Sequence, residues 1–341
     1  MRQRDIIVIG ASAGGIEALK TLVATLPSTF PAAIFVVVHM SASSPGLLAG
    51  ILDNAGPLPV LQATDQAAIR KGRIYVAPPD HHLLLEAGWM RVTHGPKENR
   101  FRPAIDPLFR SAAYAFGPQV TGVVLSGMLD DGTAGLWAIK DRGGMAIVQE
   151  PREALYSSMP QSALKYVAVD HRLLISEMAP VLEELARTPL AEEGEAPMSE
   201  ALAIETRIAL EDNALESGVL QLGKPSLYTC PECHGVLMQI EEGELVRFRC
   251  HTGHAYSQET LLAEIDEMIE AGLWNAVRTM DEKALLLRRM AQANGAQSEG
   301  DTERRFHQKA AEVTQRAQLI RQLILDREAS NPAPLPAALV S

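Results

Sequence analysis

Short apolar runs alternate with amphipathic stretches along the first half of the chain. The apolar runs are rich in valine and isoleucine, which is typical of strands buried on both faces of a parallel sheet. We predict strands at Ile6–Ile9, Ile34–Val38, Val60–Gln62, Ile74–Val76, Thr121–Leu125 and Ala146–Val148. We predict helices at 15–26, 107–116, 133–142 and 173–186. This alternation indicates an α/β fold with a doubly wound, mainly parallel sheet between two layers of helices, a three-layer αβα arrangement.

Two further apolar segments, 83–86 and 90–93, lie on either side of a short turn at Gly88. Consecutive strands that are joined by a tight turn form an antiparallel hairpin. We therefore expect a hairpin that is added to the parallel sheet.

The pattern changes in the second half of the chain. Acidic, proline and glycine residues at 188–197 are typical of a linker, and a helix is expected from about Ser199 to Glu211. From Ser257 onwards, apolar residues at steps of three and four predict two long helices on either side of Asn294-Gly295. The first stripe comprises Leu262, Ile265, Ile269, Leu273, Val277, Met280, Ala284 and Leu287, and the second Phe306, Ala310, Val313, Ala317, Ile320 and Ile324.

The two long helices are expected to pair as an antiparallel hairpin. Two interpretations of this hairpin stay open: the helices bury only each other, or they carry a dimerisation or partner-docking surface. The proline-containing segment 331–341 is expected to be a frayed tail.

Composition and charge narrow the class of protein. The chain has 341 residues and a formal net charge of −11, which argues against a general nucleic-acid binder because few phosphates would be neutralised. It contains no run of 18 or more apolar residues, so we expect no membrane insertion. The start, Met1–Asp5, leads directly into a strand rather than into a signal peptide, and a cytoplasmic location is expected.

The glycine-rich turn Gly10–Gly15 lies between the first strand and the first helix. A dinucleotide-binding turn requires Gly-x-Gly-x-x-Gly and an acidic residue about 20 positions later. Here Ser12 replaces the middle glycine, and His39 ends the second strand where the acidic residue would lie. The same residues satisfy Gly-x-Ser-x-Gly, the nucleophile elbow of serine hydrolases. We prefer the hydrolase interpretation over a turn whose serine only caps the helix.

Three residues suited to nucleophilic catalysis follow strands of the predicted sheet. Ser12 follows the first strand, His39 closes the second, and Asp131 comes after the strand at 121–125. The carboxyl ends of parallel strands meet at one edge, so these side chains are expected to converge. A hydroxyl, an imidazole and a carboxylate together form a constellation that activates a serine. Alternative bases are His81, His82 and His94, which we interpret as structural or surface residues.

Residues 4–186 resemble the catalytic domain of the chemotaxis protein-glutamate methylesterases, the CheB family. The resemblance is carried by Val8-Ile-Gly-Ala-Ser-Ala-Gly-Gly15, Val37-Val-His-Met40, Tyr75-Val-Ala-Pro78, Arg102-Pro-Ala-Ile-Asp106 and Leu125-Ser-Gly-Met-Leu-Asp-Asp-Gly132. It implies a serine hydrolase in which Ser12 is the nucleophile, His39 is the general base and then acid, and Asp131 orients the imidazole. Asp130 is the runner-up for the carboxylate.

The resemblance also implies a substrate and an oxyanion site. The substrate would be a glutamate methyl ester on a methylated chemoreceptor or a related sensory protein, hydrolysed to glutamate and methanol, and related enzymes also deamidate glutamine. No cofactor is implied for catalysis. We expect the backbone N–H groups of Ala13 and Met128 to bind the oxyanion, although the family commonly has threonine where this chain has Ala13. Arg102 and Asp106 would shape the substrate groove, or Asp106 would cap the helix before Pro107.

The usual architecture of the family places a receiver domain before the catalytic domain, and we expect none here because the first strand begins at about residue 5. We therefore expect regulation by another route. The chain would act on another sensory pathway or be regulated through its C-terminal half.

The three cysteines of the chain all lie between residues 230 and 250. Cys230 and Cys233 form a Cys-x-x-Cys pair, and Cys250 and His254 follow after sixteen residues. Thiolates and imidazole at this spacing suit tetrahedral zinc, and a closed set of four ligands makes the metal structural. His251 or His234 would be substitute ligands. The alternatives are three reduced cysteines without metal, or Cys-x-x-Cys redox chemistry.

These patterns divide the chain into five parts. They are a methylesterase-type catalytic domain at 1–190, a linker and helix at 191–225, a zinc-ribbon-like module at 226–256, a helical hairpin at 257–330 and a flexible tail at 331–341. The competing function is a non-catalytic signalling adaptor that acts through its C-terminal helices.

Overall fold

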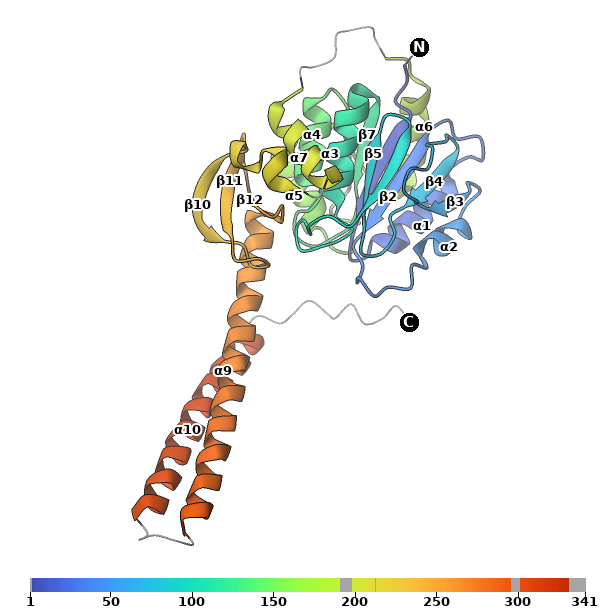
Figure 1. Ribbon diagram of the computed structural model, residues 1–341. Helices are drawn as coiled ribbons and strands as arrows, with labels where there is room; N and C mark the ends of the chain where they lie inside the picture. Colours follow the sequence, from blue (N-terminus) through green and yellow to red (C-terminus); the bar gives the residue numbers. More distant parts are fainter. Residues whose placement is uncertain (1, 191–197, 212, 296–300, 331–341) are drawn as a thin grey trace. The chain divides into compact units, whose positions relative to one another are not determined.

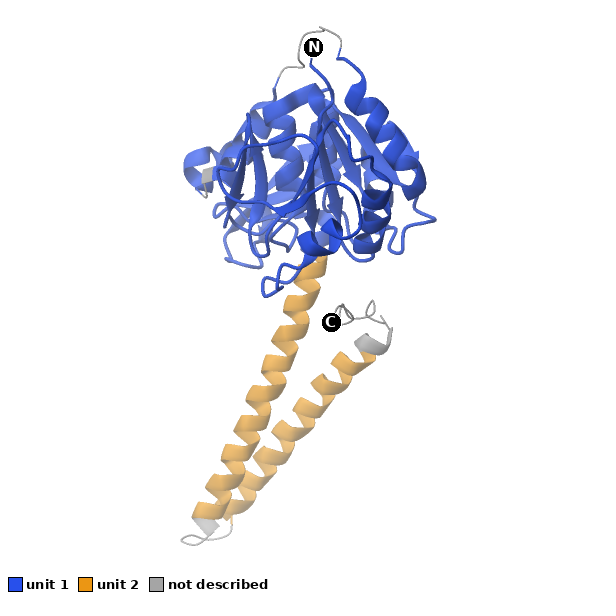
Figure 2. Cartoon of the chain, turned by 90° about the vertical axis from the view of Figure 1, so that its right-hand side faces the viewer, with its two compact units in different colours: residues 1–261 blue, residues 262–341 orange. Residues whose placement is uncertain are grey.

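The computed structural model describes residues 2–190, 198–211, 213–295 and 301–330 (Figure 1). Its residues divide into two compact units, Met1–Leu261 and Leu262–Ser341 (Figure 2). Most of the linker predicted at 188–197 and the whole tail predicted at 331–341 lie outside the described residues.

The first unit is built on a seven-stranded sheet in the order β3-β4-β2-β1-β7-β8-β9, and every neighbouring pair is parallel. The strands are β1 (Ile6–Ala11), β2 (Ala33–Val38), β3 (Val60–Gln62), β4 (Arg73–Val76), β7 (Val120–Val124), β8 (Met145–Gln149) and β9 (His171–Leu173). All six predicted strands are confirmed. The short edge strand β9 was not predicted, because none of its three residues is buried and the sequence there lacks an apolar run.

Helices cover both faces of this sheet (Figure 1). They are α1 (Gly15–Thr25), α2 (Leu48–Asp53), α3 (Ile105–Phe116), α4 (Thr133–Asp141), α5 (Ser158–Tyr166) and α6 (Ile175–Arg187), with a short 3-10 helix at Gly117–Gln119. Alternate residues of β1 enter two different cores: Val8 packs with residues of α3 and α4, whereas Ile9 packs with residues of α1 and α6. The predicted three-layer αβα arrangement is therefore confirmed.

The predicted hairpin exists but does not join the large sheet. Strands β5 (His82–Glu86) and β6 (Trp89–Thr93) form a separate two-stranded antiparallel sheet. Leu83, Leu85 and Met90 are fully buried in the same apolar core as α3. The hairpin buries one face against the helix layer instead of extending the sheet, so the expectation that it is added to the parallel sheet is wrong.

A second, antiparallel sheet completes the first unit. It follows α7 (Glu200–Glu211), α8 (Ala214–Ser217) and a 3-10 helix at Val219–Gln221. Its strands, in order, are β10 (Lys224–Thr229), β11 (Val236–Glu242), β12 (Leu245–Cys250) and β13 (Ala255–Ser257). Cys250 ends β12, and Cys230 and Cys233 lie in the turn between β10 and β11.

Buried ion pairs connect the antiparallel sheet to the rest of the first unit. The guanidinium of Arg249 on β12 is fully buried and lies 2.9 Å from both Glu98 and Glu205. Glu98 also pairs with Arg110 of α3. Burial opposes the charge of Glu98, but the two arginines hold the pKa of its carboxyl below the usual value. Removing one member would leave an uncompensated buried charge, so these pairs tie β12 to the segment before α3.

The second unit consists of two long helices, which Figure 2 colours orange. Helix α9 (Gln258–Gly295) begins at the end of the first unit, and α10 (Asp301–Ser330) follows residues 296–300, which lie outside the described part. Arg288 bonds Thr314, and Arg321 pairs with Asp281, each at 2.9 Å. The later residue of α9 contacts the earlier residue of α10, so the helices are antiparallel, as predicted.

The buried residues of the helical hairpin agree only in part with the predicted stripes. Val277, Ala284, Ala310, Val313, Ala317 and Ile324 are buried. Leu262 and Ile269, however, are 62% and 49% exposed. No helix in the described residues is both long and apolar enough to cross a membrane.

Candidate active site

Ser12 lies in the turn between β1 and α1. Gly14 has a φ of +73°, and a Cβ atom there would lie 2.7 Å from the Cβ of Leu155. A Cβ atom on Gly15 would lie 2.5 Å from the Cβ of Ala11. Only glycine therefore allows this tight passage from strand to helix. The N–H of Ser12 donates to the carbonyl of Ser126 at 2.9 Å, which ties the turn to the loop after β7.

A hydrogen-bonded row joins the three residues that were predicted to converge. The Nδ1 of His39 lies 3.1 Å from the Oγ of Ser12, and its Nε2 lies 2.6 Å from Oδ2 of Asp131. A carboxylate only accepts hydrogen bonds, so Nε2 carries the ring proton and Nδ1 is free to accept from the serine hydroxyl. The imidazole also stacks on Phe101, with ring centroids 3.8 Å apart. The geometry is that of a serine activated by an oriented base.

The carboxylate of Asp131 is buried and surrounded by donors. Besides His39, its donors are Ile105 N at 2.7 Å, Asn99 Nδ2 at 2.8 Å, Gly132 N at 2.9 Å and Asp106 N at 3.2 Å. The N–H groups of Ile105 and Asp106 begin α3, where a helix has free donors and attracts negative charge. Burial by itself would raise the pKa of Asp131, but His39 and these donors hold it below the usual value. Asp131 is therefore ionised at neutral pH.

Asp106 does not cap the helix that contains it. Its Oδ1 accepts from the N–H groups of Gly132 and Gly135, at 3.1 and 2.6 Å. These donors begin α4, so Asp106 satisfies the N-terminus of the neighbouring helix, and the expected capping role before Pro107 is wrong. Burial and the negative charge of Asp131 raise the pKa of Asp106 to about 8.

Asn99 is a member of the site that the sequence analysis missed. It is only 4% exposed, and its Nδ2 donates to both Asp131 and Asp106. Its φ of +48° is a conformation that asparagine adopts more readily than most residues. A single asparagine in a segment without apolar periodicity is typical of an exposed turn, so no signal in the sequence indicated this position.

The runner-up carboxylate, Asp130, bonds neither ring nitrogen of His39 among the described residues. Its Oδ1 accepts from the hydroxyl of Ser257 at 2.7 Å. Burial raises the pKa of Asp130 to about 7. The structure therefore places Asp131, and not Asp130, beside the imidazole.

The three alternative histidines make other contacts. His82 is fully buried, its Nε2 donates to the carbonyl of Pro96 at 2.9 Å, and burial lowers its pKa. His81 bonds the carbonyl of Pro79, and His94 lies 3.0 Å from Asp80. Each fits a structural or surface role.

Arg102, which was expected to shape a substrate groove, pairs with Asp80 at 2.7 Å and donates to the carbonyl of Gly95 at 2.7 Å. Both contacts hold the loop before α3 in place.

Of the two expected oxyanion donors, Ala13 lies in the same turn as Ser12 and Met128 lies in the loop after β7. Within the described residues, neither Ala13 N–H nor Met128 N–H donates a hydrogen bond to the backbone. Met128 follows Gly127, where an added Cβ atom would lie 2.9 Å from the Cβ of Ser12 and 2.0 Å from Sδ of Met159. The close approach of Gly127 brings the second turn against the serine.

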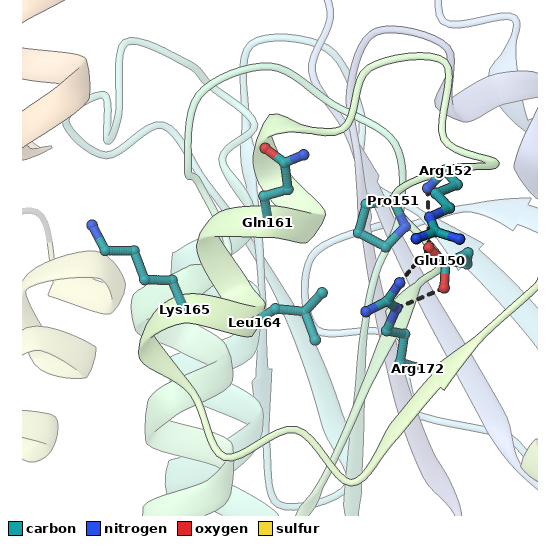
Figure 3. Close-up of a pocket in the computed structure, with 7 residues that line it drawn as sticks. All are labelled: Glu150, Pro151, Arg152, Gln161, Leu164, Lys165 and Arg172. Carbon is teal, nitrogen blue, oxygen red and sulfur yellow. Dashed lines mark hydrogen bonds and ion pairs between the residues drawn. The ribbon is translucent and has the colours of Figure 1, made fainter.

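Figure 3 shows a pocket in the first unit. It is lined by Glu150, Pro151, Arg152, Gln161, Leu164, Lys165 and Arg172. Glu150 and Arg172, at one side of it, form two parallel hydrogen bonds of 2.6 Å. None of Ser12, His39 and Asp131 lines this pocket.

The predicted metal ligands come together in the antiparallel sheet. The Sγ atoms of Cys230, Cys233 and Cys250 and a ring nitrogen of His254 lie within 4.8 Å of one another. The Sγ atoms of Cys233 and Cys250 are 3.5 Å apart, and Nδ1 of His254 lies 3.6 Å from Cys250 Sγ. Tetrahedral zinc with bonds of about 2.3 Å would place its sulfur ligands about 3.8 Å apart. The donor set and its spacing therefore fit zinc. The substitute ligands, His251 and His234, lie outside this group of four.

Comparison with known proteins agrees with the geometry. The family model described as CheB methylesterase matches residues 7–182. The crystal structure of the Thermotoga maritima CheB methylesterase catalytic domain superposes with a TM-score of 0.52 and 34% identity, covering 53% of this chain and 98% of that one.

Curated relatives match the same part. A Leptospira interrogans protein, provisionally named protein-glutamate methylesterase/protein-glutamine glutaminase, is 38% identical over 187 residues, which are 54% of this chain and 97% of that protein. A protein-glutamate methylesterase/protein-glutamine glutaminase of Anaeromyxobacter dehalogenans is 39% identical over 54% of each chain, so this chain spans about half the length of that relative. This chain belongs to the CheB methylesterase family.

Proposed function

We propose that this chain is a serine-dependent protein-glutamate methylesterase that acts on methylated chemoreceptors or related sensory proteins. The observation that carries the proposal is the hydrogen-bonded row from Ser12 through His39 to Asp131. The names of the curated relatives support the same reaction on glutamate residues of a protein, and the resemblance to the chemotaxis family supplies the class of substrate.

In the proposed mechanism, Nδ1 of His39 takes the proton of Ser12 while the serine Oγ attacks the ester carbonyl. Asp131 stabilises the imidazolium that forms. The N–H groups of Ala13 and Met128 stabilise the negative oxygen. His39 then gives its proton to the leaving methoxide, so that methanol departs and an acyl-enzyme remains. Water, activated by His39, hydrolyses the acyl-enzyme to glutamate.

The first test is release of methanol from a methylated chemoreceptor fragment by the full chain. Release well above the uncatalysed rate is the expected result. Ammonia release from a fragment with glutamine at the same position tests the second reaction named in the relatives. If no methanol appears but a fluorophosphonate labels Ser12, the chain is a serine hydrolase with another substrate. If Ser12 is also unreactive, the hydrolase proposal is wrong.

We further propose that Cys230, Cys233, Cys250 and His254 hold one structural zinc ion. The metal would connect the turns that flank β11 and β12, and catalysis would need no cofactor. Cys250→Ser is expected to lose about one equivalent of zinc by elemental analysis. Its melting temperature should also be at least about 5 °C lower, since each kcal/mol lost from the free energy of unfolding lowers the melting temperature by about 2–4 °C in a domain of this size.

His251→Asn is the matched control for this zinc prediction. It alters a histidine next to Cys250 that lies outside the group of four and should keep its metal. A Cys250→Ser protein with full zinc content would contradict the proposed ligand set.

A dimer or a regulatory partner held by the C-terminal helices stays a prediction. Large apolar side chains on α9 and α10 support it, because Leu286 and Leu323 are 59% and 64% exposed. This surface also favours the second candidate function, a signalling adaptor, and the methanol assay distinguishes the two. We propose a cytoplasmic location, as the family's chemotaxis role implies, and no nucleic-acid partner in view of the net charge of −11.

A further inference from the structure

Both the NH₂ group and the oxygen of the Asn99 side chain form hydrogen bonds. They connect the proposed triad to residues 255–260, at the end of the first unit, which we call the C-terminal segment. Its Nδ2 donates to Asp131 Oδ1 at 2.8 Å and to Asp106 Oδ2 at 2.9 Å. Its Oδ1 accepts from Ser257 N at 3.0 Å and from Thr260 Oγ1 at 3.2 Å. A rotated amide would direct its NH₂ group at the Ser257 N–H and its oxygen at the ionised carboxylate of Asp131. The partners therefore fix the amide in one orientation.

Ser257 and Thr260 form a capping box at the start of α9. The N–H of Thr260 donates to Ser257 Oγ at 3.0 Å, and the N–H of Ser257 donates to Thr260 Oγ1 at 2.8 Å. This reciprocal pair satisfies donors that the first turn of a helix leaves free. The hydroxyl of Ser257 donates to Asp130, and the hydroxyl of Thr260 lies 2.9 Å from Ser257 Oγ and 3.2 Å from Asn99 Oδ1. The side chains of Ser257 and Thr260 are buried at 5% and 0% exposure.

The backbone reinforces this connection. The N–H of Asn99 donates to the carbonyl of Ala255 at 2.8 Å, and the N–H of Ala255 donates to the carbonyl of Lys97 at 3.3 Å. Strand β13 therefore runs beside the segment that carries Asn99. His254, one of the four residues of the proposed zinc site, directly precedes β13.

We propose that Asn99 is a positioning residue for Asp131 and that the capping box of Ser257 and Thr260 holds Asn99 in place. Both residues of the box lie beyond residue 182, where the match to the family ends, so the C-terminal segment completes the active site. The inference rests on the proposed role of the triad. Its physical basis is that Asn99 fixes Oδ1 of Asp131 while Oδ2 bonds His39. Without the amide, the carboxylate has one donor fewer to hold its plane toward the imidazole.

The test uses substitutions in the full chain. Asn99→Ala is expected to lower kcat about 100-fold with KM unchanged, because misplacement of a catalytic group by about 1 Å has an effect of that size. Thr260→Val keeps the shape of the side chain but removes its hydroxyl. It should lower kcat about 5–10-fold, as expected for the loss of one hydrogen bond. Thr260→Ser keeps the hydroxyl and should restore kcat to near the value of the unsubstituted protein.

Asn213→Ala is the matched control. Asn213 caps α8, where its side chain accepts from Glu216 N at 3.2 Å, so its loss weakens a helix cap without touching the site. If Thr260→Val acted only through the cap of α9, its melting temperature would fall while its kcat stayed, like that of Asn213→Ala, near the value of the unsubstituted protein.

Two readouts do not depend on the substrate. One is the rate at which a fluorophosphonate labels Ser12, and the other is the downfield proton resonance of the hydrogen bond between His39 and Asp131. Asn99→Ala and Thr260→Val should slow labelling and shift or remove the resonance, whereas Thr260→Ser and Asn213→Ala should not.

These readouts separate the failure of the inference from the failure of the proposed function. A protein that releases no methanol but whose Ser12 is labelled more slowly in Asn99→Ala and Thr260→Val would lack the proposed function and keep the positioning role. Equal labelling rates and unchanged resonances in both variants would overturn the inference. If Asn99→Ala does not fold, the Thr260→Val and Thr260→Ser pair decides by the same criteria.

Discussion

Ser12→Ala is expected to lower the kcat for ester hydrolysis by at least about 10⁴-fold. The alanine has no oxygen to attack the carbonyl, so the acyl-enzyme cannot form, and only binding and oxyanion stabilisation would remain. The hydroxyl lies 3.1 Å from Nδ1 of His39 and forms no other hydrogen bond within the described residues. The melting temperature and zinc content should therefore match those of the unsubstituted protein. Methanol release from a methylated receptor fragment measures the effect.

Ser41→Ala is a suitable control for that substitution. Ser41 is exposed and bonds Ser43 in the loop after β2, so its loss should leave turnover unchanged. Turnover that persists in Ser12→Ala, with a folded protein, would remove serine catalysis from the mechanism.

Asp131→Asn is expected to lower kcat by about 10³–10⁴-fold. Every partner of the carboxylate is a donor: His39 Nε2 and Ile105 N bond Oδ2, and three further N–H groups bond Oδ1. Either orientation of an asparagine would direct its NH₂ group at N–H donors. The imidazole would lose its negative partner, and the tautomer that leaves Nδ1 free would no longer be favoured. Single-turnover methanol release measures the loss of the chemical step.

Asp130→Asn is the matched comparison, because it makes the same change one residue earlier. The hydroxyl of Ser257, which bonds Asp130 at 2.7 Å, can donate equally to an amide oxygen. Burial already raises the pKa of Asp130 to about 7, so a neutral side chain replaces a group that is near half protonation at neutral pH. We expect kcat within about 10-fold of the unsubstituted protein. The reverse ranking of the two variants would assign the triad carboxylate to Asp130.

Local pattern was sufficient for the framework of the first unit and for the three residues that the proposed mechanism uses. Strands buried on both faces must be continuously apolar, so β1, β2 and β7 could be read directly. The parallel topology then brings their carboxyl ends to one edge. Ser12, His39 and Asp131 were predictable for that reason, since each follows a readable strand. The spacing of the cysteines likewise predicted the group of four that the structure assembles.

Elements that are too short to show a periodic pattern of apolar residues, or whose pattern fits two positions, were missed or misplaced. Strand β9 has only three residues and no buried one, and α2 is a six-residue helix. The hairpin of β5 and β6 was readable as a hairpin, but its position was not. Its pattern of apolar residues fits a hairpin that extends the large sheet and equally a hairpin that packs against α3. Only the packing of the whole unit selects between these two positions.

The sequence by itself determined which residue types stand at the ends of the central strands, and therefore the class of chemistry. Only the tertiary structure decided how those residues are held. Asp106 caps a neighbouring helix, and Asn99 receives a hydrogen bond from Ser257, 158 positions away. Such contacts depend on the distances between side chains that distant segments bring together, and neither residue lies in a periodic pattern that would reveal its partner. Hydrogen bonding of buried polar groups is obligatory, but the fold alone selects which donor meets which acceptor.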